Sequence, residues 1–566
     1  MFCNKLLNIM CISFLLFWST ISSAEDEKDI TEECCIFLGE PGLVGPGGIS
    51  FETKGDVMFS FGVTTRIIPT YERNWDFGIN DVDGLNLVGG TANNLLVSHF
   101  TESGVNAGEY IRGQANFYIN ALPQDRSWSF FTLLQADSTL DVTNVDANAG
   151  AGNQQSDFGI ERLHGSARLG DSNWRVHAGW DLWETDMGAG AGLVLLEDQP
   201  GIWLTGANND RSFDWNVGWF KFNENNTLPD ASSFAVADGD NPGHDRNVFA
   251  GYLNQKVPTG RIRYFYTYDD INDVPVGSIS RNIAGQTTST IASTSSNGSD
   301  AQVHHLGAYY AGKVNTVDLM FEGVYEFGSV DNAGLTGVID GGRDSYDVSG
   351  YAFAGRVALN TGNVRPNIGF VYSSGDSDPS DGDLEGYTSN AAGTRFTAFG
   401  GENTILNDTN LVLGTAIFGF LPDGLGNGTP VFTGGIDNFA GFGMGRGDNP
   451  GLWMIQAGFE MGPFSNGATF TSNARAFGWN EDFMIESLAT GSTSRTEINS
   501  GYAGTEWANE LIFPLNKAAA IKFQATALFP GEGIEDITEA YGAGGGVDTK
   551  SDDTAWRAAA EFVWNF

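Results

Sequence analysis

Four aspartates gather in one polar stretch of the chain, and their spacing could support metal binding. They are Asp376, Asp378, Asp381 and Asp383, with Glu385 two residues further on. Ca²⁺ prefers several carboxylate oxygens on a flexible loop, and this spacing is similar to that of an EF-hand loop with one residue too many between Asp378 and Asp381. The stretch therefore has two interpretations, a structural Ca²⁺ site in an extracellular loop and a solvated acidic turn.

A histidine and a serine form a second arrangement that could do chemistry. His164 and Ser166 stand between Arg162 and Arg168, and all four share one face if this stretch is a strand. The pair is similar to that of a barrel phospholipase, which needs Ser and His on the membrane-facing surface and a third group to orient the imidazole. Two arginines on the same face should point into water instead. We therefore interpret the four residues as a polar wall and predict no enzymatic activity.

Charged side chains recur at alternate positions along the whole chain. A Lys or Arg that faces lipid at the membrane midplane costs ~2–4 kcal/mol, so in a membrane barrel such side chains should face the lumen. The early strands supply a basic wall of Arg66, Arg112, Arg162, Arg168 and Arg175. The later strands supply an acidic wall of Asp318, Glu322, Glu326, Glu460 and Glu506. Arg263, Arg356, Arg475, Lys522 and Arg557 interleave with these acids, so an unspecialised polar lumen with mixed charges is the alternative interpretation.

The strands that would hold these side chains are visible as alternation of apolar and polar residues. In the last segment, the even-numbered positions from Trp556 to Phe566 are all apolar, whereas the odd-numbered positions include Arg557 and Glu561. This pattern indicates a strand with one apolar face and one mixed face. A terminal aromatic strand resembles the recognition signal of outer-membrane proteins, so Trp564 and Phe566 are the predicted signal for the barrel-assembly machinery.

The same alternation predicts an all-β, transmembrane, antiparallel up-and-down barrel of 18 strands. The predicted strands are 51–72, 108–121, 128–136, 158–169, 173–182, 200–206, 212–222, 246–256, 259–269, 303–312, 315–328, 350–359, 363–372, 451–461, 467–479, 504–515, 518–529 and 554–566. The alternation is weakest in 200–206 and 246–256, so 16 strands is the alternative count. Tight connections alternate with long polar ones, as short periplasmic turns and long extracellular loops do in barrels. Both termini are then periplasmic.

The N-terminus is typical of a secretory signal. Lys5 is the first charged residue, an apolar region follows from Ile9 to Trp18, and residues 22–24 (SSA) form a small-residue cleavage site. We predict a signal peptide at 1–24, a periplasmic segment at 25–50 and the barrel at 51–566. After cleavage only the adjacent Cys34 and Cys35 remain of the four cysteines, and no Cys/His spacing indicates zinc or covalent haem.

Composition excludes several other classes of protein. The 566 residues carry a formal net charge of −41, which excludes a nucleic-acid-binding protein that needs basic patches. Beyond the N-terminus, no stretch reaches the roughly 18 apolar residues of a membrane helix. A barrel remains because only its alternate residues must be apolar.

Four short motifs resemble the alginate-export family of outer-membrane barrels and the porin-like proteins grouped with it. They are residues 66–75 (RIIPTYERNW), 372–383 (YSSGDSDPSDGD), 504–506 (GTE) and 527–532 (ALFPGE). The resemblance spans the chain from about residue 55 to its end and implies an 18-stranded pore. An alginate conduit would need a strongly basic lumen, which the acidic balance of this chain does not favour.

The function that we predict is passive diffusion of small hydrophilic solutes or ions through an outer-membrane porin of a Gram-negative bacterium. One alternative is a dedicated exporter of an alginate-like polysaccharide. A second is a surface barrel without an open pore, either an adhesin or a barrel enzyme. The predicted partners are outer-membrane lipid and lipopolysaccharide, the assembly machinery and the solutes, with a homo-oligomer left open. No cofactor is expected apart from the candidate Ca²⁺.

Overall fold

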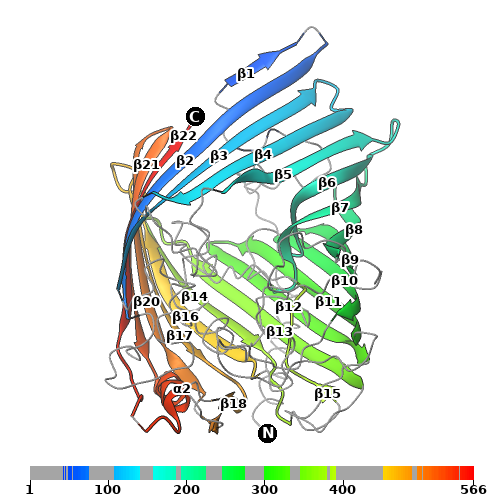
Figure 1. Cartoon of the computed structure of the whole chain (residues 1–566). Helices are drawn as coiled ribbons and strands as arrows, with labels where there is room; N and C mark the ends of the chain where they lie inside the picture. The colour runs from blue at the N-terminus through cyan, green and yellow to red at the C-terminus, as the bar shows by residue number, and fades with distance from the viewer. Residues whose placement is uncertain are drawn as a thin grey trace.

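The described part of the chain forms one closed antiparallel barrel of 18 strands (Figure 1). The computed structural model describes Leu43, Gly45 and residues 49–53, 55–74, 107–140, 157–186, 193–224, 245–274, 299–331, 345–378, 383–390, 450–486, 494–499, 501–546 and 548–566. The predicted signal peptide, Cys34 and Cys35 lie outside these residues. The prediction of an all-β barrel with 18 strands is confirmed.

Every predicted strand overlaps a strand of the barrel. In order around the sheet, the strands are β2 (Val57–Arg73), β3 (Ala107–Pro123), β4 (Trp128–Thr139), β5 (Asp157–Arg168), β6 (Trp174–Glu184), β7 (Leu196–Ala207), β8 (Phe213–Glu224), β9 (Asp245–Val257), β10 (Gly260–Val274), β11 (Ser299–Val314), β12 (Val317–Asp331), β13 (Ser345–Leu359), β14 (Val364–Ser373), β16 (Leu452–Met461), β17 (Thr469–Gly478), β20 (Tyr502–Asn516), β21 (Ala519–Pro530) and β22 (Ala555–Asn565). The two weakly alternating segments are β7 and β9.

The first predicted strand, 51–72, is in fact two strands. β1 (Ile49–Glu52) turns back at Thr53 and pairs with the start of β2, with Ile49 opposite Phe61. Asp56 adopts a left-handed φ of 56° at this turn, a conformation that aspartate tolerates better than most residues. β1 therefore forms a short hairpin with β2 beyond the end of the barrel, and it appears at the top of Figure 1.

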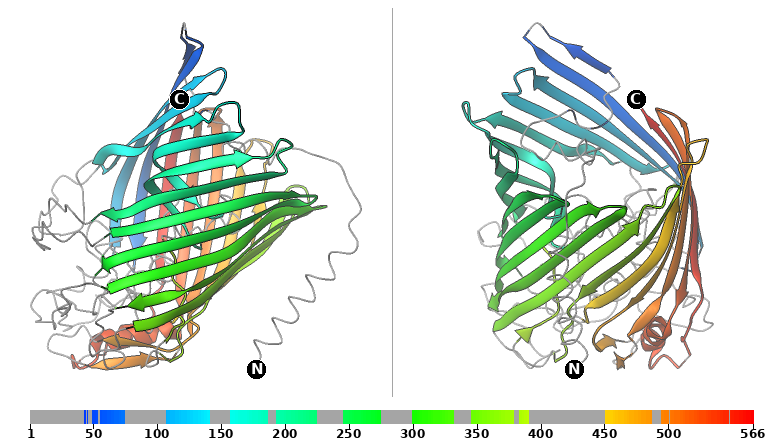
Figure 2. Two further views of the ribbon diagram at one scale, coloured as in Figure 1. Left: turned by 90° about the vertical axis from the view of Figure 1, so that its right-hand side faces the viewer. Right: turned by 180° about the vertical axis from the view of Figure 1, so that it is seen from behind.

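The strands join at the seam between β2 and β22. Eight residue pairs define the register there, from Thr64 opposite Asn565 to Arg73 opposite Trp556. Closure matters because an open sheet edge would leave backbone N–H and C=O groups unsatisfied in lipid. Both views in Figure 2 show the strands inclined around the barrel, as closure of a sheet requires.

Tight turns connect the strands at one end of the barrel. β11 and β12 are joined through Asn315, whose φ of 55° is the left-handed geometry that two-residue hairpin turns need. Gly362, with a φ of 94°, serves the turn between β13 and β14. The alternate connections, at the other end, are long. One of them carries the helix α2 (Glu532–Gly542) and another carries the hairpin of β18 (Phe483–Glu486) and β19 (Arg495–Ile498).

The barrel is apolar outside and polar inside, the reverse of a soluble protein. Outward positions hold large apolar side chains that stay exposed, such as Ile202 at 53% and Ile455 at 60%. Inward positions on the same strands hold buried polar side chains, such as Thr205 and Gln456. An exposed apolar surface that runs around a closed sheet is the lipid-facing surface of a membrane barrel. Among the described residues, no helix is both long enough and apolar enough to span a membrane.

Aromatic rings mark the outer surface near the long connections. Phe249 (β9), Tyr268 (β10), His304 (β11) and Phe327 (β12) stack in sequence across four strands, with neighbouring ring centroids 6.0, 4.7 and 4.9 Å apart. Trp174 and Trp215 form an edge-to-face pair near the tight-turn end. Two such girdles fix the height of a barrel in a bilayer because aromatic rings favour the interfaces.

Candidate functional site: the barrel lumen

The arginines of the predicted basic wall lie on four strands, β2, β3, β5 and β6. The Nε atom of Arg66 lies 3.3 Å from Glu561, and the Nε atom of Arg162 lies 2.6 Å from Asp198. Arg112 is half-buried on β3, opposite Ile68 of β2. Each of the two ion pairs places a carboxylate against an arginine, which reduces the positive potential of this side of the lumen.

Two arginines of this wall differ in their surroundings. Arg168 is exposed where β5 ends at a tight turn, directly opposite Arg175 of β6. Arg175 is buried, and its Nη1 atom donates to the Ser166 hydroxyl at 2.9 Å, while Nη2 donates to the carbonyl of Arg126. Arg175 therefore links β5 to the turn between β3 and β4, in which Arg126 lies.

His164 and Ser166 face the lumen and have structural partners. The Nδ1 atom of His164 lies 3.2 Å from Asp181, and the Ser166 hydroxyl accepts the Arg175 hydrogen bond. The ring of His177 stacks on Trp203 with centroids 5.2 Å apart. A barrel phospholipase presents its pair to the membrane, so this inward arrangement is that of a polar wall.

The predicted acids divide into two groups. Asp318 and Glu460 stay about a third exposed near the tight turns, and Arg365 bridges them at 2.9 and 3.5 Å. Glu322, Glu326 and Glu506 are buried. Glu506 lies 3.7 Å from the Nη1 atom of Arg475, directly across the strand pair β17–β20. The acidic side of the lumen is thus interleaved with arginines on neighbouring strands.

Two chain segments from long connections enter the lumen and rest on its wall. The first lumen segment consists of residues 184–186 and 193–195, which run from the last residue of β6 to the residue before β7. The second lumen segment consists of residues 374–378 and 383–390, after β14. Its β15 (Asp383–Leu384) continues the barrel sheet along the edge of β13, and the residues after β15 lie against the inner wall. They meet where the Tyr387 hydroxyl donates to the Leu193 carbonyl at 2.6 Å and the Asn390 N–H donates to the Val194 carbonyl at 3.0 Å. Together they narrow the lumen.

Arg263 of β10 anchors the first lumen segment. Its side chain is 1% exposed, lies 3.7 Å above the Tyr252 ring, and donates from Nε to Asn254 at 2.7 Å. Its Nη1 atom donates to the carbonyls of Glu184, Thr185 and Asp186. A guanidinium is suited to this role because its donors lie in one fixed plane.

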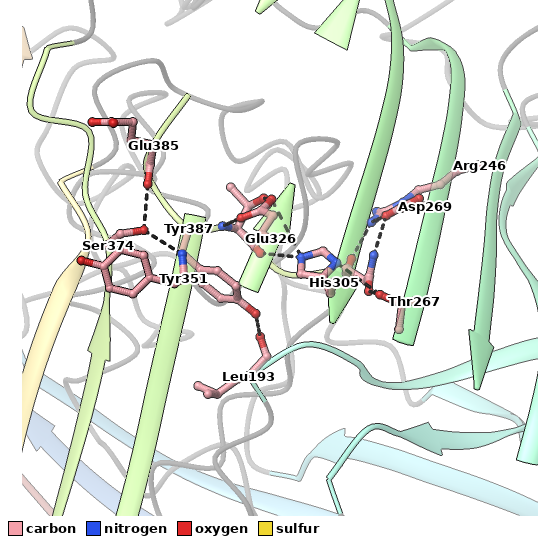
Figure 3. A network of polar contacts seen from close by, with 12 residues as sticks. Leu193, Arg246, Thr267, Asp269, His305, Glu326, Tyr351, Ser374, Glu385 and Tyr387 are labelled. Carbon is pink, nitrogen blue, oxygen red and sulfur yellow. Dashed lines mark hydrogen bonds and ion pairs between the residues drawn. The ribbon is translucent and has the colours of Figure 1, made fainter. Parts of the chain in front are cut away.

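The second lumen segment is held mainly through Thr388 and Asn390. Their partners on the barrel wall include Asp269, His305 and Glu326, which Figure 3 labels. Glu326 accepts hydrogen bonds from both the N–H and the hydroxyl of Thr388, and His305 Nε2 lies 2.9 Å from the Thr388 carbonyl. The Asn390 amide donates to Asp269 at 3.0 Å and accepts from the Thr267 hydroxyl at 2.6 Å. Arg246 donates to the Asn390 carbonyl at 2.6 Å.

Gly350 of β13 makes room for this contact. A side chain there would place its Cβ 2.8 Å from the Cα of Tyr387 and 2.8 Å from the Glu326 carboxylate. Only a residue without Cβ lets the second lumen segment approach the wall so closely. A glycine at an inward strand position is the signal that could have indicated this contact from the sequence.

The aspartates of the candidate Ca²⁺ site lie at the start of the second lumen segment. Asp376 is 1% exposed, and its carboxylate accepts from the N–H of Asp378 at 3.1 Å. Asp383 begins β15, and Asp381 lies outside the described residues. Among the described residues, no group of three or more His, Cys, Asp or Glu side chains is arranged to hold a metal ion. Calcium binding here stays a prediction.

Sequence reasoning missed the roles of Arg246, Asp269, Thr388 and Asn390. The first two lie near strand ends beside other polar residues, such as Asn247 and Asp270, and the other two belong to a polar stretch that looks like any solvated loop. Glu326 was predicted as part of the lumen wall, and it is inward-facing, but a chain segment covers it.

No protein-family model and no curated protein sequence matches the chain. Among solved structures, the chain is similar to Acinetobacter baumannii OccAB2, with a TM-score of 0.45 and 11% identity, over 90% of this chain and 98% of that one. It is similar to Pseudomonas aeruginosa OccK8 (OprE), with a TM-score of 0.44 and 10% identity, over 90% and 98% of the two chains. It is also similar to Pseudomonas aeruginosa OccK2 (OpdF) in complex with glucuronate, with a TM-score of 0.42 and 12% identity, over 90% and 98%.

Proposed function

We propose that the protein is a channel of a Gram-negative outer membrane that admits small hydrophilic solutes or ions by passive diffusion. The observation that carries this proposal is the closed barrel with an apolar outer surface and a lumen wall of hydrogen-bonded polar side chains. A barrel of this size encloses more space than its own side chains fill. The two lumen segments then set the size of the solute.

The apolar outer surface and the barrel topology also support a location for the protein in the outer membrane. A lipid-facing β-barrel is typical of outer membranes, where the long connections face outward and the tight turns face the periplasm. In this orientation both ends of the barrel sheet are periplasmic, and the girdle of Phe249, Tyr268, His304 and Phe327 meets lipopolysaccharide. Phe566 lies at the seam, where it would be presented to the assembly machinery.

Export of an acidic polysaccharide is the alternative function. The four motifs that resemble the alginate-export family favour it, and a polyuronate would need a continuous basic path. The pairing of Arg66, Arg162 and Arg475 with carboxylates weakens such a path. Solute diffusion is therefore the function that we favour over export and over catalysis.

Single-channel recording in planar bilayers tests the proposal. A diffusion channel gives stable conductance steps in potassium chloride, and small neutral solutes of increasing size block or permeate with a sharp limit. A folded barrel that gives no conductance at any voltage would contradict the proposal and favour a surface barrel without a pore.

A further inference from the structure

A cluster of four charged side chains holds the second lumen segment. Arg246, Asp269, His305 and Glu326 stand on the neighbouring strands β9, β10, β11 and β12, face the lumen, and are at most 6% exposed. Arg246 binds both oxygens of Asp269, at 3.0 Å from Nε to Oδ1 and 2.5 Å from Nη2 to Oδ2. Buried charges persist only where they are balanced and hydrogen-bonded, so the total charge of this cluster matters.

The charge of the cluster is decided by His305 and Glu326. The Arg246–Asp269 pair is neutral by itself, and His305 Nε2 lies 3.8 Å from the Glu326 carboxylate. If this second pair holds one titratable proton, on either residue, the whole cluster is neutral. If it holds none, one buried negative charge has no counter-charge within the cluster.

The hydrogen bonds place that proton on His305. The Asn390 amide is oriented by its donation to Asp269, so its oxygen must accept the single proton of the Thr267 hydroxyl. His305 Nδ1, 3.2 Å from the same hydroxyl oxygen, is then satisfied only as a donor. Its Nε2 atom faces the Thr388 carbonyl and must also donate. Both ring nitrogens donate only in the imidazolium form.

The other groups around the pair do not supply this proton. Tyr387, whose ring meets His305 edge-on at 5.9 Å, keeps its own proton because burial raises the pKa of its phenol well above the ordinary value. β13 contributes Gly350, which has no side chain, and Glu322 lies two inward positions along β12 from Glu326. Arg246 and Asp269 are the other charged side chains of the cluster, and His304, the preceding residue of β11, is a further titratable neighbour of His305.

We propose that the second lumen segment is a proton-dependent latch, docked while the His305–Glu326 pair holds its shared proton and released when rising pH removes that proton to water. The proposal rests on the channel function proposed above and adds its regulation. The docked state retains one proton that the released state loses. The equilibrium constant for docking should therefore fall about tenfold per pH unit over the pH range in which this proton dissociates.

Conductance as a function of pH is the first test. As the pH is raised from acidic to alkaline, the wild-type channel should change from a low to a higher conductance, with the midpoint set by the one linked proton. Glu326→Gln removes the carboxylate, so loss of the His305 proton no longer leaves a buried negative charge, and the low-conductance state should persist over the whole pH range. His305→Gln should move the rise to lower pH. The matched control is Glu510→Gln, which removes another buried inward glutamate, on β20, and should retain the pH response.

Thiol labelling tests the latch without relying on conductance. Ser389 lies between the two anchoring residues and is 1% exposed. In a chain with its native cysteines replaced by serine, Ser389→Cys should react slowly with a water-soluble maleimide at neutral pH and much faster above the transition. The same cysteine in the Glu326→Gln background corrects for thiolate formation and should show only that smaller increase.

The outcomes separate the two proposals. Conductance that does not change with pH, together with equal labelling profiles in the two backgrounds, overturns the latch and leaves the channel intact. Absence of conductance in every variant overturns the channel function, whereas the labelling profiles still decide whether the segment is released with pH. Heat-modifiable migration on gels shows for each variant that the barrel has folded.

Discussion

Val63 and Phe566 exchange both of their backbone hydrogen bonds, at 3.0 and 2.8 Å, so the last residue of the chain is paired directly to the first strand of the barrel. The terminal residue thus extends the seam that β22 forms with β2. Phe566 is 58% exposed, which leaves the residue accessible for contact with other molecules during assembly.

Deletion of Phe566 should therefore reduce the amount of folded barrel in the outer membrane. The loss removes one bonded pair from the seam and the aromatic end of the predicted assembly signal. The measurement is the fraction of heat-modifiable protein in isolated outer membranes. Phe566→Tyr is the control and should assemble like the wild type. Equal assembly of the deletion would contradict a role for this residue.

Arg475 and Glu506 should be energetically coupled, so that removing one partner alone destabilises the barrel more than removing both would predict. Both side chains are at most 1% exposed, and Arg475 also donates to Gln456 at 2.9 Å. Arg475→Met or Glu506→Gln alone leaves a buried charge and should lower the free energy of unfolding by about 3–5 kcal/mol. The double variant should lose much less than the sum. Urea unfolding in lipid vesicles measures the cycle, and additive losses would exclude direct coupling.

Ion selectivity should respond to the exposed charges near the tight turns. Asp318 and Glu460 flank Arg365, and all three are about a third exposed. We expect mild cation selectivity in the wild type. Asp318→Asn with Glu460→Gln should lower it, and Arg365→Ala should raise it. Reversal potentials across a potassium chloride gradient give the sign, and the differences should fade near 1 M salt, where the Debye length is about 3 Å. Strong anion selectivity in the wild type would instead support export of an acidic polymer.

Removal of the Asn390 side chain should widen the lumen at neutral pH. Asn390→Ala loses the hydrogen bonds to Asp269 and Thr267 and leaves both wall residues to bind water. The expected result is a higher single-channel conductance. Tyr387→Phe removes only the hydrogen bond to Leu193 and should have a smaller effect in the same recordings. A larger effect of Tyr387→Phe would indicate that the contact between the two lumen segments dominates.

The calcium interpretation of the aspartate cluster predicts one weak site. Isothermal titration calorimetry should detect it in the millimolar range typical of extracellular modules. Asp378→Asn should weaken binding, while Asp552→Asn, an exposed aspartate on another connection, should not. No heat of binding at millimolar Ca²⁺ would leave the solvated acidic turn as the interpretation.

The barrel could be predicted from the sequence because its signals are local. Side-chain alternation has a period of two whatever the partner strand, and a residue such as Asn315 marks a turn by itself. Even the weakly alternating β7 and β9 could be placed, because short and long connections alternate along the chain. The latch could not be predicted in this way. Thr388 and Asn390 act through their contacts with Glu326 and Asp269, which lie far away in the sequence, and no local pattern marks such contacts. The alternation shows which side chains face the lumen and which face lipid, but it does not show which chain segments occupy the lumen.

The seam between β2 and β22 determines which forms of the chain can assemble into a closed barrel. Thr64 and Asn565, which are hydrogen-bonded across it, are separated by 501 positions in the sequence. A growing or truncated chain therefore has no partner for the free edge of β2, and a partial sheet would hold open edges that lipid cannot satisfy. A break within one of the long connections is different. It leaves two half-barrels whose four edges match only each other, so the two fragments, produced together, should still find the closed form, whereas loss of a single strand from either end should prevent it.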